Sequence, residues 1–484
     1  MISPQALTFI DKPTLLRSAA AQELREHIMH NRPSPTPELN DPNLRIETVY
    51  EGLELPTSMA FLGVDDILVT EKDSGRVQRV VNGELQEQPV IDVQVANNDE
   101  RGLLGIDIYN TNNQRYVFLF FTESGGGEDG DDWSEGIEPS GTRLYRYNIA
   151  QGMGGLQLTD ETLLLDLPAT PGPRYHGGPV AIGPDNNVYV VIGTVDHHET
   201  QAQNFEDGPP PDGTSGVIRI PQDGQVANIQ GIISDEIPLN LYYAYGIRQS
   251  FGLEFDPVTG NLWDTENGPN NYDEMNLVEP GFNSGWRDLS GLAERAGDVD
   301  IEEDLIDFDG RGRYSDPEFT WQQTVAPMGL DFLNSSALGP AYQNDLFVGD
   351  YNNGNLYHFD LNEDRTELIL GGGLADRALD PGDEVNDILF GTGFGGIADV
   401  KVGPDGYLYI LTFQDDEGSI FRIVPANLPT GDDDTDGAAE EEEEEEIATT
   451  TDGADDPDEE ETVDNIGTTS LEQILADRIT VSPP

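Results

Sequence analysis

The segment GIADVKVGPDGYLYILTFQDDEGSIFRIV, residues 396–424, contains the pattern that decides the fold. An apolar stretch is followed by a Pro-Asp-Gly turn, a second apolar stretch, a polar loop and a third stretch that ends in Arg-Ile-Val. Short apolar or alternating runs separated by Gly, Pro, Asp and Asn are typical of β-strands joined by tight turns. The segment therefore predicts several short strands.

The same sequence pattern recurs about six times, with copies that begin near residues 59, 103, 177, 250, 327 and 396. A spacing of roughly 40 to 75 residues with about four strands per copy fits propeller blades. Each blade buries its faces only against its neighbours, and the closed ring hides the sheet edges. The repeat predicts an all-β fold, a six-bladed β-propeller over residues 45–426. A β-sandwich is the alternative fold, but a sandwich would lack the repeated sequence pattern.

The two flanking regions differ from the repeats in composition. Residues 14–31, LLRSAAAQELREHIMHNR, favour a helix and precede the turn-rich stretch SPTPELNDPN, so we expect a short helix and a linker over residues 1–44. Residues 427–484 contain GDDDTDGAAEEEEEEEIATTTDGADDPDEEETVDN. This acidic, low-complexity stretch has too little apolar surface to offset the entropy of ordering, so we expect a disordered tail.

The charge is strongly negative along the whole chain. There are 24 Lys and Arg residues against 93 Asp and Glu residues, which gives a formal net charge of -69, and the lysines are Lys12, Lys72 and Lys401. Concentrated salt would screen the repulsion between so many carboxylates. The composition therefore predicts a salt-adapted, haloarchaeal-like protein, and it excludes nucleic acid as a partner.

Compartment and membrane signals are sparse. The chain has no cysteine, which excludes disulfides and thiolate metal sites. No run approaches the 18 apolar residues of a membrane span, so we expect no integral membrane segment. The first 22 residues lack the charged start and unbroken apolar stretch of a signal peptide.

Three segments together resemble the soluble quinoprotein glucose/sorbosone dehydrogenases, a family of aldose sugar dehydrogenases. They are ERGLLGI (100–106), PGPRYHGGPVAIGPDNNVYVVIG (171–193) and YAYGIRQSFGLEFDPVTGNLWDTENGPNNYDEMNLVEPGFNSGW (243–286). The resemblance implies a six-bladed propeller whose central cleft binds pyrroloquinoline quinone (PQQ) and a calcium ion. It also implies a sugar substrate, an external electron acceptor and an extracellular or cell-surface location.

Within the third segment, the resemblance assigns two cofactor contacts. Gly268 and Pro269 match the positions whose backbone carbonyls hold calcium in the family, although a Gly-Pro pair is also an ordinary turn. Arg248 matches the arginine beside the quinone, where its cation would stabilise negative charge on the reduced cofactor. An inter-blade salt bridge is the alternative for this arginine.

Other cofactor positions depart from the family. Gln249 stands where the family has asparagine, and Phe251 stands where well-studied members have glutamine. Asn352 stands where the family has a lysine, and Glu100 corresponds to a polar residue near the quinone. Because charge-assisted bonds are the strong ones, the loss of cations predicts weaker binding of a tricarboxylate.

The most serious departure from the family sequence concerns the residue that would act as the general base. The family reads His-Asn-Gly-Gly at this strand start, whereas this chain reads Tyr175, His176, Gly177 and Gly178. The histidine is displaced by one position, and in a strand one residue reverses the face on which a side chain lies. We take His176 as the candidate base and Tyr175 as a second catalytic candidate, with a packing or rim histidine as the alternative.

The leading hypothesis is thus an oxidoreductase that converts the anomeric C1 of an aldose into a lactone. A second is a non-catalytic propeller that binds carbohydrate or serves surface interactions, because fold alone does not settle function. A third is a calcium-dependent lactonase, which would require several carboxylates that converge on one ion.

Overall fold

The computed structural model describes residues 36–428, with gaps at 112–113, 131–135, 153–154, 197, 227–228, 296, 298, 383–384 and 415–416. The chain divides into two compact units, Met1–Leu428 and Pro429–Pro484, of which the first contains every described residue. The helix expected at 14–31 and the disorder expected for the acidic tail from residue 429 onward both lie outside the described residues. No helix in the described part is long and apolar enough to cross a membrane.

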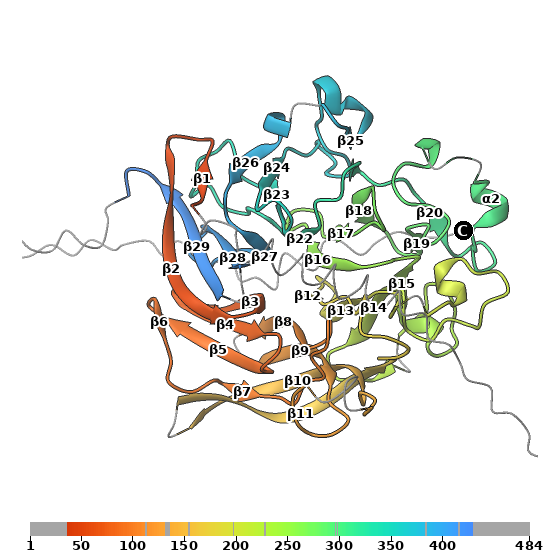
Figure 1. Cartoon of the computed structure of the whole chain (residues 1–484), viewed down its shortest axis with the longest axis horizontal. Helices are drawn as coiled ribbons and strands as arrows, with labels where there is room; N and C mark the ends of the chain where they lie inside the picture. The colour runs from red at the N-terminus through yellow and green to blue at the C-terminus, as the bar shows by residue number, and fades with distance from the viewer. Residues whose placement is uncertain are drawn as a thin grey trace, which may run out of the picture. The chain divides into compact units, whose positions relative to one another are not determined.

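Six sheets, mostly antiparallel, surround a central axis (Figure 1). Their innermost strands are β3 (Pro56–Gly63), β8 (Leu103–Asn110), β12 (Val180–Ile182), β16 (Ser250–Phe255), β22 (Pro327–Phe332) and β27 (Gly396–Val402). Each of these strands contacts the next, and β27 contacts β3, which closes the ring. A closed ring of six sheets is a six-bladed propeller. The fold prediction is confirmed, and the sandwich alternative is excluded.

The remaining strands complete the blades, which we number 1 to 6 from β3 to β27. Blade 1 adds β4 (Asp66–Glu71), β5 (Arg76–Val81), β6 (Glu84–Leu85) and β7 (Ile91–Asp92), and blade 2 adds β9 (Arg115–Glu123), β10 (Gly141–Gly152) and β11 (Gly155–Leu167). Blade 3 adds β13 (Asn187–Ile192), β14 (Gly216–Pro221), β15 (Tyr242–Tyr245), β19 (Phe282–Asn283) and β20 (Arg313–Tyr314). Blade 4 adds β17 (Leu262–Glu266), β18 (Asp273–Val278), β21 (Phe319–Trp321) and β25 (Ala378–Leu379). Blade 5 adds β23 (Leu346–Asp350), β24 (Leu356–Phe359), β26 (Leu389–Thr392) and β1 (Glu38–Leu39), and blade 6 adds β28 (Leu408–Gln414), β29 (Glu417–Pro425) and β2 (Leu44–Glu54).

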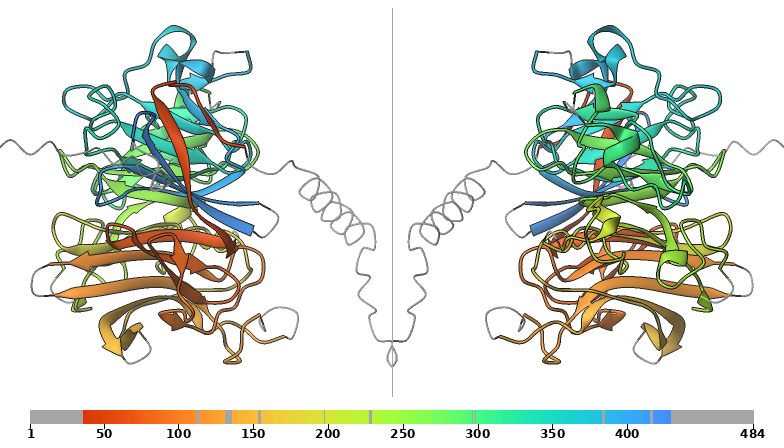
Figure 2. Two further views of the ribbon diagram at one scale, coloured as in Figure 1. Left: turned by 90° about the vertical axis from the view of Figure 1, so that its left-hand side faces the viewer. Right: turned by 90° about the vertical axis from the view of Figure 1, so that its right-hand side faces the viewer.

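Short helices interrupt the connecting loops. They are α2 (Ile301–Asp304) and the 3₁₀ helices η1 (Gln201–Gln203), η3 (Leu239–Leu241), η4 (Ala293–Arg295), η5 (Gly372–Asp376) and η6 (Val385–Asp387). Figure 2 shows the ring from two sides, with the first blades in orange and the later blades in green and blue.

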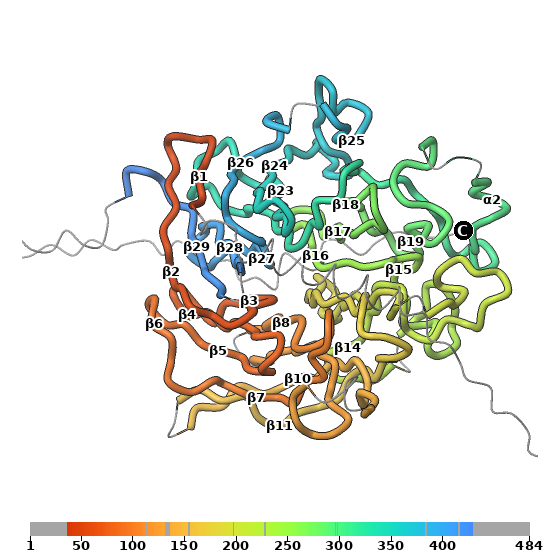
Figure 3. The backbone as a smooth tube through the Cα atoms, in the orientation of Figure 1, coloured from red at the N-terminus to blue at the C-terminus, as the bar shows by residue number. Residues whose placement is uncertain are grey.

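Blade 6 closes the ring with strands from both ends of the propeller. Strand β2 pairs antiparallel with β29, and Thr48 lies opposite Phe421. The red and blue segments of the tube therefore run side by side (Figure 3). Across the same pair, Arg422 Nη2 lies 2.7 Å from Glu47 Oε2. The pairing holds the first and last parts of the propeller in one blade, which is how the ring closes.

The core consists of apolar layers between neighbouring blades, and strand periodicity decides which side chain enters which layer. On β13, Val188, Val190 and Ile192 pack into the layer shared with blade 2. Tyr189 and Val191 point the opposite way, into the layer shared with blade 4. Because alternate side chains face opposite sides of a strand, a strand buried on both faces reads as a continuous apolar run. Each such side chain contributes about 1.5–3 kcal/mol when fully buried.

Carboxylates join the innermost strands near the axis. Asp107 on β8 accepts a hydrogen bond from its own neighbour Ile108 N at 2.6 Å and from Ile182 N of the next blade at 2.9 Å. The same arrangement recurs at Asp331, which binds Phe332 N and Val402 N, and at Asp399, which binds Val400 N and Met59 N. The acidic residues of these strands therefore have a structural function.

Lys401 lies among these carboxylates. Its Nζ is 2.6 Å from Glu254 Oε2. Burial lowers its pKa, but the surrounding carboxylates, Glu254 first, more than offset this, so the pKa is raised well above that of an ordinary lysine. Burial also raises the pKa of Asp107 to about 6 and that of Asp331 to about 7. Lys401 is thus outnumbered by the carboxylates that surround it, Glu254, Asp399, Asp331 and Asp107.

Candidate active site

A cavity of about 470 Å³ opens on the axis of the ring. All six innermost strands contribute to its wall, with Thr57 on β3, Leu104 on β8, Val180 on β12, Phe251 on β16, Met328 on β22 and Asp399 on β27. Loop residues Lys72, Asp99, Glu100, Asn267 and Tyr351 also line it. A largely apolar pocket with a few convergent polar groups is the usual form of a small-molecule site. We call this cavity the central cleft.

Arg248 lies at the Gly268 turn beside the cleft. Its Nη1 donates hydrogen bonds to the carbonyl oxygens of Asn267 at 2.7 Å and Gly268 at 3.1 Å. The guanidinium also stacks over the ring of Tyr175, with its Cζ 4.3 Å from the ring centroid. The side chain is buried, at 7% exposure. The structure thus brings together three of the residues predicted from the sequence.

The Gly268 turn is rigid for steric reasons. A Cβ atom at Gly268 would lie 2.3 Å from Asn271 O, so only glycine fits there. Gly268 N donates to Asp273 Oδ1 at 2.8 Å, which anchors the turn to β18. Pro269 follows and is exposed. The calcium assignment of Gly268 and Pro269 stays a prediction, and Gly268 O is the carbonyl of the pair that contacts Arg248.

Two polar atoms in this region have no hydrogen-bond partner among the described residues. They are Arg248 Nε and Asn267 Oδ1, both buried. A buried donor or acceptor without a partner is costly, by about 1–3 kcal/mol, and calls for an explanation such as a ligand or ion. One donor and one acceptor thus remain unsatisfied at the same turn.

Glu100 forms a second polar group in the wall of the cleft. Its Oε2 accepts hydrogen bonds from Tyr175 N at 2.6 Å and from Gln249 Nε2 at 2.8 Å. Gln249 is held in turn, because its Oε1 accepts from Gly177 N at 2.9 Å. Burial raises the pKa of Glu100 to about 7. The structure therefore places Glu100 and Gln249 side by side, and their assignment as cofactor contacts stays a prediction.

His176 is not among the residues that line the cleft. The side chain has 0% exposure. Its Nδ1 lies 3.0 Å from Thr142 Oγ1 and its Nε2 lies 3.0 Å from Gly172 O. Nε2 also lies 3.4 Å from Arg101 Nε, so protein atoms engage both ring nitrogens. The assignment of His176 as base stays a prediction, and its present contacts are those of a packing residue.

Of two further predicted residues, Tyr175 lies at the Arg248 site, whereas Asn352 lies at the surface. Tyr175 adopts a left-handed backbone with φ +62° and stacks on Arg248. A bulky residue at positive φ is uncommon and costs energy, so such positions cluster at functional sites. Asn352 is exposed, donates from Nδ2 to Thr324 O at 3.2 Å and does not line the cleft. Tyr351, its neighbour, lines the cleft instead.

Lys72 and Asn267 were missed by the sequence reasoning. Lys72 Nζ lies in the cleft wall and donates to the carbonyl oxygens of Asn97, Asp99 and Arg101, at 3.0–3.1 Å. The signal that could have found Lys72 is the scarcity of lysine, because the chain contains only three lysines. Asn267 directly precedes the Gly-Pro pair, but nothing in that position marks its side chain.

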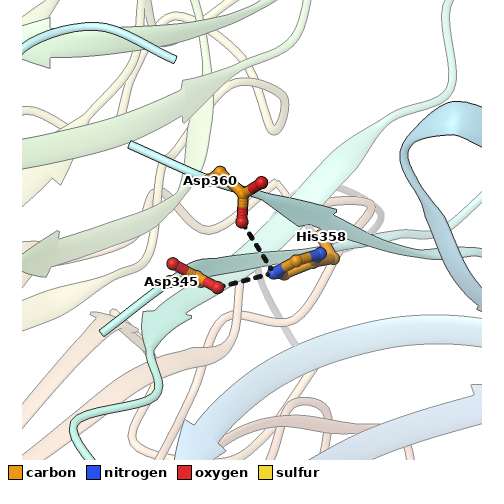
Figure 4. A group of neighbouring side chains, drawn as sticks. All are labelled: Asp345, His358 and Asp360. Atoms are coloured by element: carbon orange, nitrogen blue, oxygen red, sulfur yellow. Dashed lines mark hydrogen bonds and ion pairs between the residues drawn. The ribbon is translucent and has the colours of Figure 1, made fainter. Parts of the chain in front are cut away.

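A histidine with two carboxylates lies on blade 5 (Figure 4). His358 Nε2 is 2.9 Å from Asp345 Oδ2 and 3.7 Å from Asp360 Oδ1. The imidazole packs against Phe347 and Tyr342, with ring centroids 5.0 and 5.3 Å away. The ring nitrogen already has two carboxylate partners within the protein, so we assign no metal to this group.

Comparison with known proteins gives the family. The model of the glucose/sorbosone dehydrogenase family matches residues 53–422. This chain therefore belongs to the glucose/sorbosone dehydrogenase family. An uncharacterized protein of Synechocystis is 28% identical over 406 residues, which cover 79% of this chain and 87% of the relative. The aldose sugar dehydrogenase of Escherichia coli is 24% identical over 396 residues, which cover 79% of this chain and 94% of the relative.

Solved structures agree on the fold. A putative glucose dehydrogenase from Thermus thermophilus is 25% identical, with a TM-score of 0.58, and the match covers 79% of this chain and 100% of that structure. The PQQ-bound aldose sugar dehydrogenase of Streptomyces coelicolor is 20% identical, with a TM-score of 0.55, over 81% of this chain and 100% of that structure. The family includes sugar dehydrogenases, and one structural relative binds PQQ.

Proposed function

We propose that this chain oxidises an aldose at C1 to the lactone, with PQQ and calcium bound in the central cleft and the electrons passed to an external acceptor. The observation that carries the proposal is the meeting of Arg248 with the carbonyls of Asn267 and Gly268 beside the cleft. These residues lie within residues 53–422, which the family model matches.

The residues at the Gly268 turn fit the two cofactors. Calcium prefers oxygen ligands, and the turn supplies the Gly268 carbonyl and the unsatisfied Oδ1 of Asn267. An anionic quinone requires a cation and donors, and Arg248 supplies a guanidinium whose Nε has no partner among the described residues. The cleft volume of about 470 Å³ lies in the range of ordinary cofactor sites.

The two cations that line the cleft, Lys72 and Lys401, are already engaged. Lys72 donates to three carbonyl oxygens, and Lys401 pairs with Glu254. A tricarboxylate would therefore depend on Arg248 more than on a set of several cations. We expect its affinity to fall when this one guanidinium is lost.

The functions of the individual residues follow from their positions. When bound, PQQ supplies a two-electron acceptor. Arg248 would stabilise negative charge, and the Tyr175 ring keeps the guanidinium in place. Apolar walls such as Phe251 and Leu104 exclude water, which strengthens these electrostatic contacts.

A second function, a propeller that binds carbohydrate without oxidising it, is favoured by one observation. The family's base is histidine, and His176 is buried with both ring nitrogens engaged by Thr142 and Gly172. A chain that kept the ring and lost the base would bind sugar without turnover. The extracellular or cell-surface location and the adaptation to salt also stay predictions.

Two measurements on the full chain test the proposal. PQQ is titrated by calorimetry into calcium-loaded protein at molar salt, and a redox dye then reports oxidation of a panel of aldoses. We expect saturable binding and sugar-dependent dye reduction, both abolished by calcium chelation. Binding of sugar without binding of PQQ would favour the second function, and binding of neither would overturn both.

A matched pair of variants gives the control for these measurements. Arg248→Met removes the cation at the turn, whereas Arg76→Met removes a half-exposed arginine of blade 1 whose Nε lies 3.5 Å from Asp92 Oδ2. We expect the first to lose PQQ binding and the second to behave as wild type. Equal loss in both variants would mean that net charge, not the site, sets the affinity.

A further inference from the structure

Glu100 occupies a position in the cleft from which it can reach a bound substrate. Its side chain is half-buried and lines the cavity, whereas His176 does not. Glu100 lies in the loop before β8, next to Asp99, and its backbone N donates to Pro173 O at 3.2 Å. Glu100 thus precedes the innermost strand of blade 2, and its side chain lines the cleft on the axis.

Groups from two other blades fix the orientation of this carboxylate. Tyr175 N, at the start of blade 3, and Gln249 Nε2, next to β16 of blade 4, both donate to Oε2. Gln249 cannot turn freely, because Gly177 N donates to its Oε1. Side chains held by a surrounding set of hydrogen bonds are the ones that serve precise chemistry.

The electrostatic surroundings tune the proton affinity of Glu100. Burial is the largest effect and raises the pKa, the Tyr175 N–H lowers it, and the neighbouring Asp99 raises it. Arg248 and Arg174 are the cations that face it, and both lower the pKa. The balance is a pKa of about 7. A proton acceptor works best when its pKa lies near the working pH.

The other charged groups of the cleft wall are less suited to accept a proton. Asp99 is half exposed and lies 3.5 Å from Arg174. Asp399 is engaged by Met59 N and Ser58. Lys72 and Lys401 are held by carbonyls and by Glu254, respectively. Among the described residues of the wall, Glu100 combines access to the cleft, fixed geometry and a suitable charge environment.

We propose that Glu100, and not a histidine, accepts the proton of the substrate's C1 hydroxyl. The proposal rests on the proposed function. In the step, the C1–H bond breaks and its hydrogen leaves with both electrons to the quinone acceptor. The O–H proton passes to a carboxylate oxygen of Glu100, and the C1–O bond becomes the C=O bond of the lactone. Glu100 then releases its proton to water at the cleft mouth.

The first test compares Glu100→Gln with Glu87→Gln, a matched change at an exposed glutamate of blade 1. We expect Glu100→Gln to lower kcat by about 10²–10⁴-fold, while KM for the sugar and PQQ affinity change by less than about tenfold. Wild-type kcat should rise with pH through about 7, as the acceptor loses its own proton. Glu87→Gln should match wild type in all three quantities.

The second test needs no cofactor. In apo protein the raised pKa of Glu100 keeps its proton bound between about 4.5 and 7, where the unfolded chain has released it. Wild type should therefore lose stability relative to Glu100→Gln as the pH rises through that window. Urea unfolding of both proteins at pH 5 and pH 8 measures the difference.

The outcomes separate this inference from the proposed function. If wild type neither binds PQQ nor reduces the dye, the proposed function fails, and the assignment of Glu100 fails with it. If wild type turns over and Glu100→Gln does so equally fast with the same pH profile, only the assignment of Glu100 fails. A stability difference that does not change between pH 5 and pH 8 would also overturn it.

Discussion

Arg248 donates through one nitrogen, Nη1, to two successive carbonyl oxygens, those of Asn267 and Gly268. The carbonyl pair of a rigid turn thus converges on a single cation. Because carbonyl oxygens that converge in this way also suit a calcium ion, the same turn is built to hold positive charge.

Loss of the Arg248 cation should weaken the turn itself. In Arg248→Met, the carbonyls of Asn267 and Gly268 lose a charged donor, and the Tyr175 ring loses its stacked partner. We expect the free energy of unfolding to fall by about 1–3 kcal/mol. Urea unfolding of the apo protein measures this, and an unchanged midpoint would mean that the contact contributes nothing to stability.

His176 should act through stability. His176→Ala removes one fully buried contact each from Thr142 Oγ1 and Gly172 O, which keep Thr122 and Arg101 as partners, and this loss should cost about 1–3 kcal/mol. We expect a lower Tm, with kcat per folded molecule within a few-fold of wild type. A fall in kcat of about 100-fold or more with unchanged Tm would instead support the base assigned by resemblance.

Closure of the ring should depend on the apolar contacts of β2. Leu53 is 1% exposed and packs into the layer between blades 6 and 1. Leu53→Ala should lower the free energy of unfolding by about 2–5 kcal/mol. Val64→Ala, at a side chain with 56% exposure, should change it by less than about 0.5 kcal/mol. Chemical denaturation distinguishes the two, and equal effects would contradict the closure argument.

Lys401 should stabilise the axis most strongly at high pH. The raised pKa values of Asp107 and Asp331, about 6 and about 7, mean that the native state keeps protons which the unfolded chain releases from about pH 4 upward. Their net effect on stability therefore becomes less favourable as the pH rises through about 4 to 7. Lys401→Met removes the opposing charge, so we expect a loss of about 3–5 kcal/mol at pH 8.

The loss in Lys401→Met should be smaller at pH 5, where more of the carboxylates hold a proton in the native state. Lys401→Arg keeps the positive charge and should lose less than Lys401→Met at pH 8. Urea unfolding of wild type and both variants at pH 5 and pH 8 gives the six free energies. A loss in Lys401→Met that is the same at pH 5 and pH 8 would show that packing, and not charge, accounts for it.

Salt should stabilise the whole propeller. With a formal charge of -69, repulsion between carboxylates opposes the compact state, and added ions screen it. We expect Tm to rise steadily from 0.1 to 2 M KCl. Sucrose at matched osmolality is the control, because it does not screen charge. A Tm that follows sucrose and KCl equally would exclude screening as the cause.

Much of the fold can be read from the sequence because its signals are local. The continuous apolar run of β13 and the turn before it, at residues 183–186, require only the geometry of one strand and one hairpin. Six such sequence repeats are enough to predict a ring, because a blade can bury both faces only against its neighbours. The Gly268 turn is also a local feature of the sequence. Arg248 and Gly268 could be found from the sequence because both lie within the single segment 243–286.

The site is decided by contacts between blades, which local patterns do not encode. Glu100 and Gln249 are 149 residues apart and meet only because the ring closes around its axis. The one-residue shift of His176 could not be assigned to a face from sequence, because His176 lies in the loop before β12 and strand alternation does not apply there. The sequence by itself determined the repeat, the family and the turn. Tertiary structure decided that His176 is buried, that Asn352 is exposed and that Glu100 faces the cleft, because burial and side-chain direction depend on neighbours distant in the chain.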